Sequence, residues 1–138
     1  MLKRILTIIK KIYFFIYYCN YRIMNIIADH SMKNSPVHGF TWPSLIFFMN
    51  LMTFALLLYG DSIQKMKELT IYSVIILYCS LIFNYFVFDH KNRYLRIIDE
   101  CKLIPERIRY IGIVFFTLYS IFSILGLLIV AFTGWKIT

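Results

Sequence analysis

Charged residues are scarce in this chain of 138 residues. Only 16% are Asp, Glu, Lys or Arg, and 60% are hydrophobic, whereas a soluble domain carries about 25% charged and about 45–50% apolar residues. This apolar excess excludes a disordered or collagen-like chain and argues against an ordinary soluble enzyme. The length allows a single domain, and too few polar residues are present to cover a water-soluble one.

Sequence motifs of catalysis and metal binding are also missing. The chain has no P-loop, no Gly-rich dinucleotide turn, no paired catalytic carboxylates and no metal-binding helix motif. Its three histidines and three cysteines show neither a C-x-x-C nor an H-x-x-x-H spacing. The sequence therefore predicts a protein that is not an enzyme, with no metal, no cofactor and no evident small-molecule substrate.

What the chain does have is three long stretches without Asp, Glu, Lys, Arg or His: residues 42–60, 69–88 and 110–133. A helix of about 20 apolar residues crosses the hydrocarbon layer of a membrane. Trp and Tyr residues, which prefer the headgroup level, fall near the six predicted ends. Pro43 is expected in the first turn of the first span, after Thr41 as a possible N-cap, and Pro105 is expected to open the helix of the third. We therefore expect an all-α integral membrane protein with three transmembrane helices.

The first 27 residues predict a helix of another kind. Cations share one stripe of the helical wheel and Ile and Leu cover the opposite side, which is typical of a basic amphipathic helix that lies in the membrane surface. A first transmembrane segment and an uncleaved signal sequence are the alternatives. The residues expected to attract anionic lipids are Lys3, Arg4, Lys10, Lys11 and Arg22.

Lys and Arg are unevenly distributed among the segments that join these stretches. Residues 1–41 hold six and residues 89–109 hold six, whereas residues 61–68 hold two and the tail holds Lys136 alone. Because cationic loops stay cytoplasmic, we expect the N-terminus inside and the C-terminus outside, in a bacterial inner membrane. Nucleic-acid binding is the other common meaning of a net charge of +8. It is not expected here, because the bilayer accounts for the cations and no binding module is present.

Residues 89–104 contain no Gly and no Pro before the turn at Ile104. The opposite charges of Arg96 and Glu100 stand at i, i+4, a spacing that supports a helix, and so do Asp89 and Arg93. We expect the second span to continue as a cytoplasmic stalk and to form a helical hairpin with the third. The stalk is the expected site for docking a partner, and a merely solvated helix end is the alternative. The docking residues are Arg93, Arg96, Asp99 and Glu100.

Small, hydroxyl and amide residues recur near every 3.5 residues in each predicted span. Such residues associate membrane helices by close packing and hydrogen bonds. They predict the interior of a three-helix bundle, with a surface for self-association or for a partner span, or the lining of an oligomeric pore, as alternatives. Asn50 and Asn84 are expected at different depths and so not to pair. The residues are Asn50, Thr53, Gly60, Ser73, Ser80, Asn84, Gly112, Ser123 and Gly126.

Two Asp-His dipeptides, Asp29-His30 and Asp89-His90, are expected at the same interface, most simply as interfacial polar residues. Cys19 and Cys101 are expected in a reducing compartment, where disulfides are rare, and palmitoylation is an alternative in a eukaryote. The function expected from these features is that of a non-enzymatic membrane subunit or anchor, acting with lipids and with copies of itself or another protein. An oligomeric pore or membrane-disrupting effector, or an immunity protein against one, is the alternative.

Overall fold

The computed structural model describes residues 1–28, 30–31 and 33–134, and the described part is helical throughout apart from its turns. Three of its helical segments are long and apolar enough to cross a membrane, which confirms the expected all-α, multi-pass membrane fold. The five α-helices are α1 (Leu2–Ile27), α2 (His38–Tyr59), α3 (Ile63–Asn84), α4 (Arg93–Lys102) and α5 (Glu106–Thr133).

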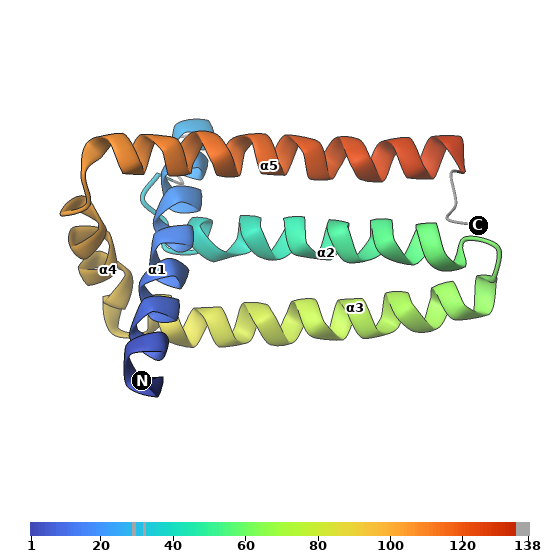
Figure 1. The fold of residues 1–138 in the computed structure, drawn as a ribbon, viewed down its shortest axis with the longest axis horizontal. Coiled ribbons are helices and arrows are strands. Elements are labelled where there is room, and N and C mark those ends of the chain that lie inside the picture. The colour runs from blue at the N-terminus through green and yellow to red at the C-terminus, as the bar shows by residue number, and fades with distance from the viewer. Residues whose placement is uncertain (29, 32, 135–138) are drawn as a thin grey trace.

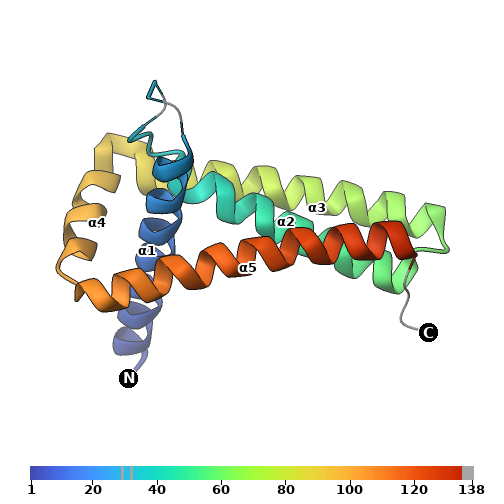
Figure 2. The same ribbon diagram turned by 90° about the horizontal axis from the view of Figure 1, so that it is seen from above.

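Helices α2, α3 and α5 run side by side, and α1 and α4 run across one end of them (Figure 1). The second view shows the same arrangement, with the loop between α2 and α3 at the opposite end (Figure 2). We call α1 and α4 together the end layer. Helices α3 and α5 both pack on α2, which lies between them. This differs from the expected hairpin of the second and third spans, because the middle position is taken by the first.

Helix α2 begins earlier than the sequence suggested. It starts at His38, so Pro43 lies inside the helix rather than in its first turn, and Val37 takes the N-cap position expected of Thr41. The added turn is buried against α1, where the backbone of Gly39 meets the ring of Tyr17 so closely that a Cβ atom would collide with it. The earlier start of α2 is explained by its packing on the end layer. The length of an apolar run in the sequence gives no sign of such packing.

Helix α5 begins as the sequence predicts and ends on a glycine. Pro105 is its N-cap, and Gly134 at its C-cap has a φ of 61°, a left-handed conformation that glycine adopts at little cost. The aromatic residue and the cation expected just beyond it, Trp135 and Lys136, lie outside the described residues.

The expected straight stalk is replaced by a sharp turn. A π-helical turn (Tyr85–Asp89) and a 3-10 turn (His90–Asn92) end α3, and both Lys91 and Asn92 have a φ of 55°. Helix α4 then runs across the end of the bundle (Figure 1). Ion pairs link Arg96 to Glu100 at 3.9 Å and Lys102 to Asp99 at 3.1 Å, but the turn separates Asp89 from Arg93. Burial of Ile97, Ile98 and Cys101 of α4 accounts for the turn, because a straight helix would leave them in solvent.

The largest cluster of buried side chains lies in the end layer and where it meets the spans. Its centre is the ring of Tyr17, which stacks on Phe88 at a centroid distance of 4.0 Å and an interplanar angle of 10°. Residues 17–21 and Ile23 of α1 are thus buried, whereas its first eleven residues, 2–12, and its last two, Ile26 and Ile27, are exposed. We call residues 2–12 the basic arm. The cluster comprises Tyr17, Tyr18, Cys19, Tyr21, Phe40, Phe88, Ile97, Ile98 and Cys101.

Candidate functional site at the junction of α1 with the spans

Polar side chains join α2 to α5 at two levels. The Asn50 side-chain amide donates a hydrogen bond to the Tyr119 hydroxyl at 2.6 Å. Nearer the end layer, the indole N–H of Trp42 donates to the Ser120 hydroxyl at 3.1 Å. Ser120 in turn donates to the carbonyl of Phe116 in its own helix. These bonds hold α2 against α5, and Asn50 finds its partner within the same chain.

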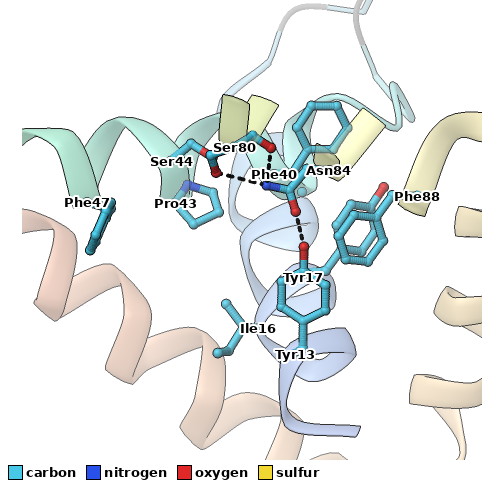
Figure 3. A pocket seen from close by; sticks show the side chains of 11 residues that line it. Tyr13, Ile16, Tyr17, Phe40, Pro43, Ser44, Phe47, Ser80, Asn84 and Phe88 are labelled. Atoms are coloured by element: carbon cyan, nitrogen blue, oxygen red, sulfur yellow. Dashed lines mark hydrogen bonds between the residues drawn. The ribbon is translucent and has the colours of Figure 1, made fainter. Parts of the chain in front are cut away.

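A second set of hydrogen bonds joins α1, α2 and α3. The Asn84 side-chain amide donates to the Ser80 carbonyl at 2.7 Å and to the Ser80 hydroxyl at 3.2 Å, while its oxygen accepts a hydrogen bond from the Tyr13 hydroxyl. The hydroxyls of Ser80 and Ser44 lie 3.4 Å apart. Asn84 therefore links a residue of α1 to a chain of hydroxyls that reaches α2 (Figure 3).

The other small and polar residues of the spans serve different roles. Gly112 permits a close approach, because a Cβ atom there would lie 2.6 Å from the Phe15 ring and 2.9 Å from the Cys19 sulfur. Thr53 bonds to the Met49 carbonyl of its own helix. The remaining four fall into three classes: Ser73 and Ser123 are buried, Gly126 is half-buried with open space beside it, and Gly60 is exposed at the end of α2.

A cation that the sequence interpretation counted only for topology holds α1 to the start of α5. The Arg109 guanidinium donates to the Tyr18 hydroxyl at 3.2 Å and to the Ile104 carbonyl at 3.0 Å. On a helical wheel Tyr18 falls on the same stripe as the cations of α1, but its ring is buried in the end layer. The hydroxyl of this side chain is polar and bonds to Arg109, whereas its apolar ring packs among the other side chains of the end layer.

The thiols of the end layer are buried and protonated. Cys101 of α4 donates to the Phe14 carbonyl of α1 at 3.7 Å. Burial, and to a smaller extent the nearby Cys101, raises the pKa of the Cys19 thiol to about 12. A thiol with so high a pKa is a poor nucleophile and a poor metal ligand at neutral pH.

The Asp-His dipeptides do not form a cluster of ligands. Asp29 lies outside the described residues, His30 is exposed, Asp89 is half-buried and His90 is exposed beside the Phe86 ring. Within residues 1–28, 30–31 and 33–134, no three side chains of His, Cys, Asp or Glu come together as a metal site requires.

The charged residues singled out in the sequence lie on the outside of the end layer. Those of α1 are all exposed, and the Lys10 ammonium lies 5.3 Å from the centroid of the Phe14 ring. The four docking residues expected on the stalk are exposed on α4. The end layer therefore brings both charged sets to one end of the bundle (Figure 1). The two sets are Lys3, Arg4, Lys10, Lys11 and Arg22, and Arg93, Arg96, Asp99 and Glu100.

A cavity of about 170 Å³ lies at this junction, between α1, α2 and the end of α3. The wall is mostly apolar, with five aromatic residues beside Ile16, Gly39 and Pro43, and its polar part consists of Ser44, Ser80 and Asn84 (Figure 3). No spacing in the sequence points to this cavity, since its lining comes from three segments that are distant along the chain.

No family model, no curated protein sequence and no solved structure matches the chain. Its function must therefore be inferred from the arrangement of its own residues.

Proposed function

We propose that the protein is a non-enzymatic membrane subunit or anchor that presents its end layer to a partner. The observation that carries this proposal is the division of its polar groups. The amide and hydroxyl groups of Asn50, Ser44, Ser80 and Asn84 bond to other residues of the same chain, and the charged residues of α1 and α4 stay exposed. The spans thus associate with one another, and the end layer is left for other molecules.

The distribution of cations supports a cytoplasmic position for the end layer. Twelve Lys and Arg belong to the segments at this end, residues 1–41 and 89–109, whereas the other end has, among the described residues, only Lys65 and Lys67 at the start of α3. When α2, α3 and α5 cross the bilayer, α1 lies along its surface, where the cations of the basic arm attract anionic lipids at about 1 kcal/mol each.

The exposed face of α4 is the docking surface of this proposal. The side chains of Arg96 and Glu100 are 75% and 59% exposed, although the opposite face of the same short helix is buried against α1. A helix held in place on one side presents its charges in a fixed arrangement. Such a surface favours a partner with complementary charges over a lipid.

Crosslinking in intact cells tests the docking surface. Reversal of two cations, Arg93→Glu with Arg96→Glu, should abolish a specific crosslinked complex while leaving the amount of protein in the membrane unchanged. Reversal of Lys65 and Lys67 at the other end is the matched control and should leave the complex intact. Equal crosslinking in both double variants would overturn the assignment of the partner to α4.

One observation favours the alternative of a membrane-disrupting effector. The basic arm exposes Leu2, Ile5 and Ile9 together with its cations, a combination found in helices that perturb membranes. Purified protein should then release dye from vesicles rich in anionic lipid, and loss of residues 2–12 should stop the release. Against a pore, Asn50 and Asn84 already have partners within the chain, so they are not left to line a channel between copies.

A further inference from the structure

The cavity between α1, α2 and α3 is required neither by the fold nor by the proposed anchoring role. A bundle gains stability by filling such a space, because unfilled volume forfeits contacts. Here the space lies beside the packed rings of Tyr17 and Phe88, where an added side chain would fill it. The cavity is partly open to its surroundings, and its volume of about 170 Å³ is close to that of an enclosed apolar cavity of about 150 Å³ known to hold one benzene molecule.

The residues that line the cavity determine which kind of ligand it can bind. All eleven lining residues are uncharged, so an ionised ligand would lose its hydration without an opposite charge to replace it. The aromatic side chains of the wall, including Tyr13, Phe40 and Phe47, offer faces and edges on which a ring packs well. The occupant is therefore a neutral, ring-shaped molecule.

The polar side of the cavity favours a ring that carries one oxygen atom able to form a hydrogen bond. Both polar ends of the Asn84 amide are engaged, by Tyr13 and by Ser80. Ser44, by contrast, has its contact with the Ser80 hydroxyl at a long 3.4 Å. Because a hydroxyl has one donor and two acceptor positions, Ser44 retains capacity for a bond to a ligand.

We propose that this cavity binds a neutral six-membered ring carrying a hydroxyl or carbonyl oxygen, with the oxygen against Ser44 and the ring against the aromatic wall. Phenols dissolved in water and the ring headgroups of membrane quinols share this chemistry. The position of the cavity next to the end layer, where the spans meet α1, places it within reach of either source.

Fluorine NMR of the full-length protein in nanodiscs tests the proposal with three probes: 4-fluorophenol, fluorobenzene and 4-fluorobenzoate. The phenol should bind saturably, fluorobenzene about fivefold more weakly for the loss of one hydrogen bond of about 1 kcal/mol, and the benzoate not measurably. Displacement of the phenol by a quinol with a short isoprenoid tail would identify the membrane source, and a lack of displacement would identify the soluble one.

Three variants separate a site from simple partitioning into lipid. Ser44→Ala should weaken phenol binding about fivefold and leave fluorobenzene unaffected. Ser44→Leu should fill the space and abolish binding of both. Ser73→Ala removes another buried serine of the spans, outside the cavity, and should change nothing. Equal affinities for phenol and fluorobenzene, or the same binding in all four proteins, would overturn the proposal. Circular dichroism confirms that each variant is folded.

Discussion

Tyr13 and Asn84 lie 71 residues apart in the chain, and the tyrosine hydroxyl donates a hydrogen bond to the asparagine side-chain oxygen. One residue belongs to α1 and the other closes α3, so this single bond ties the end layer to a span. Asn84 is also buried, and a buried amide without a partner costs more than its bond contributes.

Removal of either partner should therefore lower the free energy of unfolding. Removal of both should lower it by less than the sum of the two single effects. For Tyr13→Phe and Asn84→Leu we expect a coupling of about 0.5–1.5 kcal/mol, in the range of hydrogen bonds between membrane helices. Unfolding in mixed micelles of a mild detergent and SDS measures the free energies of unfolding of the unaltered protein, the two single variants and the double variant. The pair Tyr13→Phe with Asn50→Leu is the control and should be additive, because Asn50 bonds to α5 instead. A coupling near zero for the first pair would contradict the bond.

Two glycines of α5 should respond oppositely to the same substitution. Gly112→Ala places a Cβ atom against the Phe15 ring and Cys19, whereas Gly126 has open space within 4 Å. We expect Gly112→Ala to lower the free energy of unfolding by about 1–3 kcal/mol through overpacking. Gly126→Ala should leave it unchanged or raise it, since alanine favours a helix. The same micelle titration checks both, and a neutral Gly112→Ala would show that α1 does not lie on α5 there.

The turn between α3 and α4 should be stabilised by glycine. Lys91 and Asn92 both have a φ of 55°, a conformation that costs most side chains about 1–2 kcal/mol. Lys91→Gly should therefore raise the free energy of unfolding by up to about 1 kcal/mol, and Lys91→Val should lower it. Lys102→Gly, in the last turn of α4, is the matched control and should be destabilising. If glycine at position 91 also destabilises, α3 and α4 form a continuous helix after all.

Thiol reactivity should report on the end layer. Because burial raises the pKa of Cys19 to about 12, this thiol stays protonated from pH 7 to 9, where an ordinary thiol near pKa 8.5 ionises. In a mild detergent, modification of Cys19 by maleimide should be slow at every pH in this range and fast once SDS unfolds the protein. A cysteine introduced at the exposed Ser31 is the control, with a rate that rises with pH. Mass spectrometry of the modified peptides measures both rates, and equal rates would contradict burial of Cys19.

The three spans were predictable because they depend on composition alone. A run of twenty apolar residues without charge has one common use. Residues 110–133 lie wholly within α5, and residues 42–60 and 69–88 lie within α2 and α3 except for their last one and last four residues. Boundaries and packing were not predictable from the same signal. Phe88 illustrates the reason: it closes the apolar run of the second span, yet it is 1% exposed because Tyr17 stacks on it.

The candidate site was foreseen only in part for a related reason. Periodicity identified Ser80 and Asn84 as residues of one face, but it cannot name partners on other helices. Tyr13 and Ser44 belong to the candidate site only because α1 runs across the end of the bundle, which the sequence does not indicate. The sharp turn at Lys91 was likewise hidden, since no glycine or proline marks it and the reason for it is burial of α4 residues against α1.

The packing of α1 against α5 determines when the end layer can form during synthesis of the chain. Tyr18 is made early, but its bonding partner Arg109 and the closely packed Gly112 belong to the last helix. During synthesis the part of α1 that packs on α5 must therefore stay uncovered until the start of α5 has been made. A nascent chain stopped after residue 103 would carry two inserted helices and an unfinished end layer, which makes it a natural target for membrane quality control.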